Sequence, residues 1–188
     1  MPTFYEGGPI ETVSQTISSE DYANAFYAAY CASSPLRRRW VRAGIFLSAA
    51  IVIGSCIPFY RARFATVWIP CGGIVLALAL CILFGFVQPN DLKKWGARLY
   101  RSNVLWSIPE QIEIYRDSVI LKNTCEQILE YWTDFSLCLE TSSAFIAAGG
   151  RERELLIIKK QGLSKEQTEK ISAALSGAFA ARYVKSGR

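Results

Sequence analysis

The strongest constraint on the fold is an apolar stretch at residues 43–87, which is interrupted only by Arg61-Ala62-Arg63. Neither half of this stretch contains an acidic or basic residue. A helix that packs on a globular core carries a polar stripe at helical period, and neither half shows one. A run of about 20 apolar residues is long enough to cross a hydrocarbon core as a helix. The stretch therefore predicts a two-helix transmembrane hairpin, with helices at about residues 43–60 and 67–87.

Basic residues flank this stretch on both sides. They are Arg37, Arg38, Arg39, Arg42, Lys93, Lys94, Arg98 and Arg101. We refer to them as the basic collar, and we expect it at the membrane interface. Because basic residues next to spans mark the cytoplasmic side, the sequence predicts a multi-pass membrane protein with both termini in the cytoplasm. The same residues would suit specific recognition of an anionic lipid headgroup, but topology alone already requires them.

The chain divides into four predicted segments. These are an N-terminal segment (1–42) with an amphipathic helix at about 19–32 and a basic flank, the hairpin (43–87), a basic juxtamembrane linker helix (88–101) and a cytoplasmic domain (102–188). The first helix begins at Ser18, which has capping-box spacing to Asp21, and its aromatic residues recur at every fourth position. Packing of this helix against the C-terminal domain or the next helix is favoured over a role at the membrane surface, because the helix carries no basic residue.

The C-terminal segment changes to an alternation of apolar and polar residues, which is typical of strands. Strands are expected at 104–106, 111–115, 119–121, 127–131, 136–140, 144–148 and 154–158. A helix follows, with Ser164 as its N-cap and Gln167 at capping-box spacing. About seven antiparallel strands closed by one helix outline a pleckstrin-homology-like barrel or sandwich. The predicted fold class is thus an α+β membrane protein, with a transmembrane hairpin and a C-terminal domain of that type.

The chain also resembles the YcxB-like membrane proteins of bacteria. The matching pieces are Glu20-Asp21-Tyr22, the 43–87 hairpin, Tyr131-Trp132-Thr133-Asp134-Phe135, Leu156-Ile157-Ile158-Lys159-Lys160 and Leu163-Ser164-Lys165-Glu166. Lys159 stands where that family usually shows a proline. The resemblance implies a location in the bacterial inner membrane and a pleckstrin-homology-like domain, and it implies no reaction.

Trp132 and Asp134 are the candidate site residues of this domain. In one interpretation they form a structural corner, where Trp132 fills one end of the barrel and Asp134 accepts backbone N–H bonds in a turn. In the other they line a ligand or peptide pocket. The structural corner is favoured, because an Asp beside a buried aromatic residue usually has a local hydrogen-bonding role.

The residues that most enzymes and metal sites need are missing or scattered. The sequence has no histidine and no phosphate-binding loop, and its six cysteines form no CxxC pair, so we expect no metal and no cofactor. We expect Cys125 and Cys138 to be inert thiols, and residues 151–154 to form a solvated polar turn. Residues 102–188 hold eleven acidic and eleven basic residues, a balance that argues against nucleic-acid binding.

The leading hypothesis is a non-catalytic interaction module that is held at the membrane. Its pleckstrin-homology-like domain would bind a protein partner or a second copy of the chain, through a strand edge or a helix groove. An anionic-lipid sensor based on the basic collar is the alternative, and a membrane enzyme of unknown reaction is the third. Beyond the lipid bilayer itself, the sequence indicates no specific small-molecule ligand.

Overall fold

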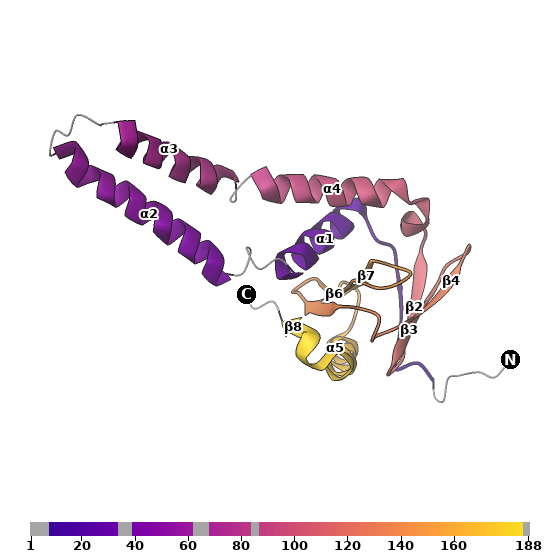
Figure 1. Cartoon of the computed structure of the whole chain (residues 1–188). Coiled ribbons are helices and arrows are strands. Elements are labelled where there is room, and N and C mark those ends of the chain that lie inside the picture. Colours follow the sequence, from indigo (N-terminus) through magenta and orange to yellow (C-terminus); the bar gives the residue numbers. More distant parts are fainter. Residues whose placement is uncertain (1–7, 34–38, 62–67, 84–86, 186–188) are drawn as a thin grey trace. The chain divides into compact units, whose positions relative to one another are not determined.

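The structure, a computed structural model, describes residues 8–33, 39–61, 68–83 and 87–185. The chain forms two units (Figure 1). The first unit combines Met1–Ala29 with Gly96–Arg188, and the second is Tyr30–Trp95. The N-terminal strand and most of the first helix therefore belong to the same unit as the C-terminal strands, whereas the sequence-based division placed them in a separate segment.

The first unit contains two four-stranded sheets. The first sheet is antiparallel, with the order β1-β2-β3-β4: β1 (Glu11–Gln15), β2 (Glu110–Ile114), β3 (Ser118–Lys122) and β4 (Gln127–Tyr131). The second sheet has the order β7-β6-β5-β8: β5 (Leu137–Glu140), β6 (Ala144–Ala148), β7 (Leu155–Lys159) and β8 (Tyr183–Lys185). Strand β8 runs parallel to β5, and the other neighbours are antiparallel. The six strands predicted between residues 111 and 158 are present.

Alternation of side chains in the first sheet builds the main core. In β2, Ile112 and Ile114 are fully buried while Gln111 is exposed. The register places Ile112 between Val13 of β1 and Leu121 of β3, so one apolar row crosses three strands. Full burial of each such side chain stabilises the folded state by about 1.5 to 3 kcal/mol. A slip of the strand pairing by one residue would turn the whole row toward solvent, so this burial fixes the register.

Helix α5 (Lys165–Phe179) covers one side of this core. The Ser164 hydroxyl accepts a hydrogen bond from the Gln167 backbone N–H at 3.1 Å, and the Gln167 side-chain oxygen accepts one from the Ser164 N–H at 2.9 Å. The predicted capping box is thus confirmed. Ile171, Leu175 and Phe179 are buried at helical spacing and belong to the same core as the strands.

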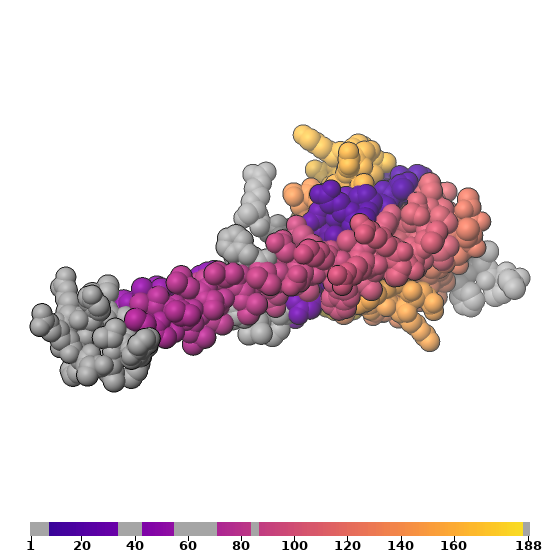
Figure 2. Space-filling view, turned by 90° about the horizontal axis from the view of Figure 1, so that it is seen from above, coloured from indigo at the N-terminus to yellow at the C-terminus, as the bar shows by residue number. Residues whose placement is uncertain are grey.

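One face of the second sheet, which includes Phe145 and Leu156, faces the same core as α5. The opposite face packs against helix α1 (Ser19–Ser33). Tyr22 and Ala25 belong to one buried cluster with Ile146 of β6 and Ile157 of β7. Trp106 stacks on Tyr22 with ring centroids 4.4 Å apart, and Figure 2 shows the indigo α1 beside the pink segment that follows residue 96. Of the two contacts expected for the 19–32 helix, with the C-terminal domain or with the next helix, the structure shows packing on the C-terminal strands.

Three short elements differ from the sequence-based expectation. Residues 104–106 do not form a strand: they lie in a 3-10 helix, η3 (Val104–Ser107), whose first turn is capped by the Asn103 side chain at 3.0 Å from the Leu105 N–H. A second 3-10 helix, η4 (Ala180–Arg182), follows α5 and leads into β8, which was not predicted. Strand β8 has only three residues, so it offers too little alternation to identify.

The second unit contains helix α2 (Arg39–Arg61) and helix α3 (Trp68–Ile82), which pack against each other. Helix α4 (Gln88–Ser102) begins in this unit and continues into the first. A Cβ atom on Gly73 of α3 would lie only 3.2 Å from a methyl carbon of Val52, so this glycine permits the close approach of the two helices. Several large apolar side chains of the unit, such as Leu47 and Val75, remain exposed.

Among the helices of the described residues, none is long and apolar enough to cross a membrane. The predicted transmembrane hairpin is therefore wrong. The predicted fold class is therefore wrong in its membrane part. The predicted multi-pass location in the inner membrane, with both termini in the cytoplasm, is wrong for the same reason. The pleckstrin-homology-like classification of the two sheets is not shown by the structure.

The described helices can be compared with the expected spans. Of the expected second span at 67–87, the structure describes residues 68–83 and 87, and α3 covers Trp68–Ile82. The 15 residues of α3 extend over roughly 22 Å at 1.5 Å per residue, which is short of a hydrocarbon core of about 30 Å. Helix α2 has 23 residues, with arginines on both sides of its uncharged run at residues 43–60.

Candidate binding groove

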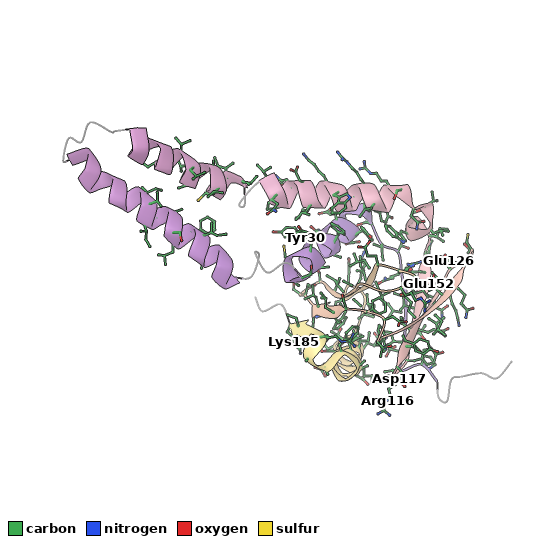
Figure 3. All side chains as sticks on the ribbon, in the orientation of Figure 1. Tyr30, Arg116, Asp117, Glu126, Glu152 and Lys185 are labelled. Atoms are coloured by element: carbon green, nitrogen blue, oxygen red, sulfur yellow. The ribbon has the colours of Figure 1, made fainter. Side chains whose placement is uncertain are left out.

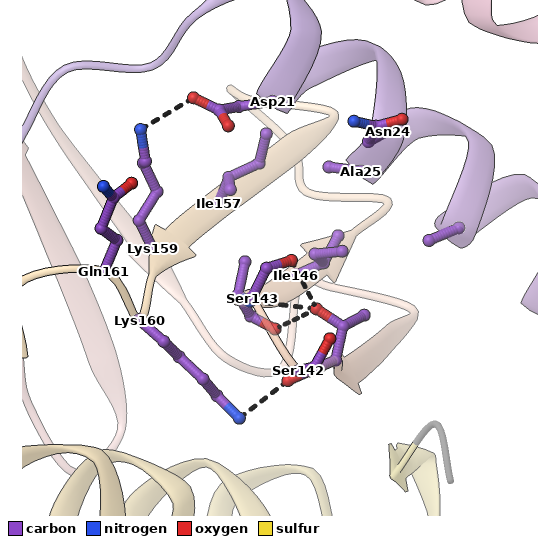
Figure 4. A pocket seen from close by; sticks show the side chains of 13 residues that line it. Asp21, Asn24, Ala25, Ser142, Ser143, Ile146, Ile157, Lys159, Lys160 and Gln161 are labelled. Carbon is purple, nitrogen blue, oxygen red and sulfur yellow. Dashed lines mark hydrogen bonds and ion pairs between the residues drawn. The ribbon is translucent and has the colours of Figure 1, made fainter. Parts of the chain in front are cut away.

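A groove of about 520 Å³ lies on the face of the second sheet that α1 only partly covers (Figure 4). Its walls are α1, the turn between β5 and β6, and the residues that follow β7. All of these elements belong to the first unit. The volume is in the range of pockets that hold small ligands or a few residues of a peptide.

The floor of the groove is apolar. Ile146 and Ile157 are paired across β6 and β7, and both point toward α1. Ala25 and Ala28 of α1 line the groove opposite them. Because alanine side chains end at Cβ, α1 can pack on the sheet without filling this space, and the spacing of the two residues places them on one face of the helix.

The charged residues at the rim are already paired. The Lys159 ammonium lies 2.8 Å from a carboxylate oxygen of Asp21. Partial burial raises the pKa of Asp21, but hydrogen bonds from Lys159 and Ser18 outweigh it, and the net pKa lies below the usual value. Lys160 binds Glu140 at 2.9 Å and the Thr141 carbonyl oxygen at 2.8 Å. The groove therefore has little net charge to offer a ligand.

Glu140, in β5, connects two other elements and one loop residue behind this rim. Its carboxylate accepts hydrogen bonds from the Tyr183 hydroxyl at 2.7 Å and the Ser172 hydroxyl at 3.2 Å, and it pairs with Lys160 and Lys185. Partial burial raises the pKa of Glu140, but the hydrogen bonds from Tyr183, Lys160 and Lys185 dominate and lower the pKa to about 2. The cluster connects β5, β8 and α5 to the residue after β7, so it holds the turn side of the groove in place.

Three uncharged polar side chains at the rim remain open to a ligand. Asn24, Ser142 and Gln161 are exposed, and within the described part of the chain their side chains make no hydrogen bond. Figure 4 shows them around the mouth of the groove. An amide side chain offers both donors and an acceptor, and a hydroxyl offers one of each kind, so all three can pair with another uncharged polar group.

The first unit already contains one such pairing, at the edge of β7. The Gln15 side-chain oxygen accepts a hydrogen bond from the Lys159 backbone N–H at 2.9 Å, and its NH2 group donates to the Ile157 carbonyl oxygen at 2.5 Å. Gln15 thus acts toward β7 as the peptide group of a neighbouring strand would. This contact demonstrates how an amide side chain of this fold recognises an extended backbone.

A second cluster of charged residues lies away from the groove. Arg153 is 7% exposed and binds Glu110 at 2.7 Å and Glu126 at 2.9 Å. The buried Glu130 accepts hydrogen bonds from the backbone N–H groups of Glu152 and Arg153, while its other carboxylate oxygen has no partner among the described residues. Figure 3 shows Glu126 and Glu152 close together at this end of the first sheet. The expectation of a solvated turn at 151–154 is therefore wrong for Arg153, and the cluster holds the β6–β7 loop against the first sheet.

The structure places the predicted site residues outside the groove. Trp132 is 2% exposed, its indole N–H donates to the Tyr115 carbonyl oxygen at 3.0 Å, and its ring lies 5.8 Å from Phe179. Asp134 is exposed, and its carboxylate accepts no hydrogen bond from a described residue. Trp132 is thus part of the core, and the turn-capping role expected for Asp134 is not seen in the described part of the chain.

The basic collar is distributed over several segments. Arg37 and Arg38 lie outside the described residues, and Arg39 and Arg42 lie in the first turns of α2. The other four, Lys93, Lys94, Arg98 and Arg101, are exposed on α4. None of the described members lines the groove.

The described residues offer no cluster of three or more side chains that could hold a metal ion. Burial and the nearby Glu140 carboxylate raise the pKa of the Cys138 thiol to about 12, so this thiol stays protonated at neutral pH. The groove itself contains neutral amide and hydroxyl groups and paired charges, an arrangement suited to binding.

Sequence reasoning missed the groove residues. Ala25 and Ala28 were not identified, and Asp21 was identified only as part of a helix start and of the resemblance. The available signal was the row of alanines on one side of an amphipathic helix, which predicts close packing or an unfilled space without deciding between them.

No family model, no curated protein and no solved structure matches this chain. The resemblance to YcxB-like proteins therefore stays a prediction.

Proposed function

We propose that the first unit is a non-catalytic interaction module, which binds a short extended peptide segment without net charge in the groove. The observation that carries this proposal is the combination of an apolar floor with three unpaired neutral polar side chains at the rim. The two lysines at the rim are neutralised by Asp21 and Glu140, so a charged ligand would have to break an ion pair to gain one.

A peptide fits this chemistry better than a hydrocarbon or an anion. Its backbone supplies alternating donors and acceptors for Asn24, Ser142 and Gln161, as β7 does for Gln15. Its apolar side chains would contact Ala28, which is half-buried and lines the groove above the buried Ile146 and Ile157. Binding would remove apolar surface from water at about 25 cal/mol per Å² while leaving no polar group unpaired.

Selection from a random heptapeptide library displayed on phage, with the full chain as bait, tests the proposal. Peptides that bind should be rich in small and apolar residues and poor in charge, and fluorescence anisotropy gives their dissociation constants. Ala28→Trp fills the groove and should weaken binding by roughly tenfold or more. Ala173→Trp is the matched control, because Ala173 is exposed on α5 and lies outside the groove.

Two results would contradict the proposal. The first is a library that yields no peptide with a dissociation constant below about 100 µM. The second is a set of peptides whose affinity is the same for wild type and for Ala28→Trp.

A second candidate function is binding to an anionic lipid surface through α4. Arg98 and Arg101, which both belong to the first unit, are exposed and three residues apart, so they share one face of this helix. Neither forms an ion pair with a described residue. Near an anionic surface each basic side chain contributes about 1 kcal/mol, which gives this face a measurable preference for such lipids.

Co-sedimentation with vesicles tests this candidate. The chain should bind vesicles of phosphatidylglycerol and phosphatidylcholine more strongly than vesicles of phosphatidylcholine alone, and salt should weaken the difference. The double variant Arg98→Gln and Arg101→Gln should lose most of this preference. Arg116→Gln with Lys165→Gln removes the same charge from other exposed sites and serves as the control. Equal binding to both kinds of vesicle would refute the candidate.

A further inference from the structure

Strand β4 is an edge of the first sheet, and part of its backbone points away from that sheet. Two backbone hydrogen bonds mark the ends of its pairing with β3. At one end the Trp132 N–H donates to the Asp117 carbonyl oxygen, and at the other the Asn123 N–H donates to the Glu126 carbonyl oxygen. Because hydrogen-bonded residues alternate along an antiparallel pair, Gln127, Leu129 and Tyr131 direct their N–H and C=O groups outward. Among the described residues, only the Tyr131 carbonyl oxygen has a backbone partner on that side, the Asp134 N–H at 3.0 Å.

The side chains of this edge do not protect it. Natural edge strands are usually shielded by lysine, proline, bulges or short length. Strand β4 has five residues, and its exposed ones, Gln127, Leu129 and Tyr131, are uncharged. Leu129 is 38% and Tyr131 48% exposed, which is unusual for large apolar or aromatic side chains next to an open backbone edge.

Two other sheet edges in the described part of the unit, those of β7 and β8, are protected. The Gln15 side chain occupies the outward backbone groups of Ile157 and Lys159 in β7. Strand β8 is only three residues long and ends at Lys185. Strand β4 is therefore less protected than either edge of the second sheet.

We propose that β4 pairs with β4 of a second copy of this chain, in an antiparallel two-fold arrangement centred on Leu129. Leu129 would face its own counterpart and exchange two backbone hydrogen bonds with it, and Gln127 would face Tyr131 in both directions. No like charges oppose each other in this register, which is why the edge suits its own copy. The exposed side chains of Leu129 would extend the apolar row that begins at Ile120, its cross-strand neighbour in β3.

A two-fold pairing of this kind stops at the dimer and does not lead to aggregation through β4. A two-fold axis uses the β4 edge of both copies, so no open β4 edge remains to recruit a third chain. The proposal is independent of the peptide groove, which lies on the second sheet.

Analytical ultracentrifugation of the full chain measures the association, and Leu129→Pro perturbs it. Proline at this position removes only an outward N–H group, so the pairing with β3 is retained. We expect the dissociation constant of the dimer to rise by roughly tenfold or more, while Leu129→Val, which keeps the N–H and an apolar side chain, should stay within about threefold of wild type.

Disulfide capture gives a second readout, which does not depend on the proline variant folding. Leu129→Cys in a Cys125→Ser background should form a cross-linked dimer under mild oxidation, because a hydrogen-bonded pair places the two Cα atoms about 5.5 Å apart. Gln111→Cys in the same background is the control, since Gln111 is exposed on β2 but lies away from the edge. A monomeric wild type, or cross-linking that is no greater at 129 than at 111, would overturn the proposal.

Discussion

The change Gly150→Ala should destabilise the first unit, although it adds a single methyl group. A Cβ atom at Gly150 would lie 2.3 Å from the Arg153 carbonyl oxygen, 2.6 Å from a ring carbon of Phe135 and 2.9 Å from a carboxylate oxygen of Glu130. Phe135 and Glu130 are both buried, and the Arg153 oxygen is part of the backbone. None of these atoms can move without displacing the core or the β6–β7 loop.

Overpacking of a close-packed site typically costs about 1 to 3 kcal/mol. We expect the upper part of that range at Gly150, because the methyl group would also disturb the two backbone hydrogen bonds that Glu130 accepts. Gly177→Ala is the matched control. A Cβ atom at Gly177 meets nothing within 4 Å, and the residue lies inside α5, where alanine is favoured over glycine by about 0.5 to 1 kcal/mol.

Urea unfolding of the full chain, followed by tryptophan fluorescence, measures both changes. In a background with Trp40, Trp68 and Trp95 replaced by Phe, the emission comes from Trp106 and Trp132, which both lie in the first unit, and Trp132 is buried in its core. The midpoint should fall for Gly150→Ala and rise slightly for Gly177→Ala. If Gly150→Ala were as stable as wild type, the close approach of the loop to Phe135 and Glu130 would be refuted.

Two further predictions concern the electrostatics and the ends of elements. Because the pKa of Glu140 is lowered from 4.5 to about 2, its stabilising effect is complete above pH 4.5 and is lost as the pH falls toward 2. Solvent screening reduces the full value of such a shift to about 1 to 2 kcal/mol, so Glu140→Gln should be less stable than wild type by that amount at pH 7 in urea unfolding, and the gap should shrink below pH 4.5. Ser164→Ala removes the hydrogen bond that the Ser164 hydroxyl accepts from the Gln167 N–H and should cost about 1 kcal/mol, whereas Ser164→Asp, which keeps an acceptor, should stay close to wild type in thermal unfolding.

Local signals predicted much of the first unit. Strands β2 to β7 alternate buried and exposed residues or carry short apolar runs between turn residues, and such patterns depend only on neighbours in the sequence. The capping boxes at Ser18 and Ser164 have the same property, since their partners lie three residues away. Strand β8 has too few residues to carry a pattern, and η3 contains β-forming residues whose hydrogen bonds follow a helical turn instead.

Features formed by residues far apart in the sequence could not be predicted from such local patterns. The groove forms between α1 and residues more than a hundred positions later, as the Asp21–Lys159 ion pair illustrates. The burial of Arg153 depends on Glu110 and Glu126, which no local pattern connects to it. For the 43–87 stretch, apolar composition identified helices but did not indicate where they end, and their lengths decide whether they can span a bilayer.

The second unit is inserted into the first, and this order has a consequence for synthesis on the ribosome. Strand β1 pairs with β2, and Gln15 and Glu110, which bond through their side chains, are 95 residues apart. At about 5 to 20 residues per second, β1 would wait roughly 5 to 20 s for its neighbour to be translated. Helix α1 waits longer, because its partners on β6 and β7 follow still later. During that interval the nascent chain carries an unpaired strand and a half-covered helix, so translation speed through residues 30–109 should affect how much of the protein reaches its native state.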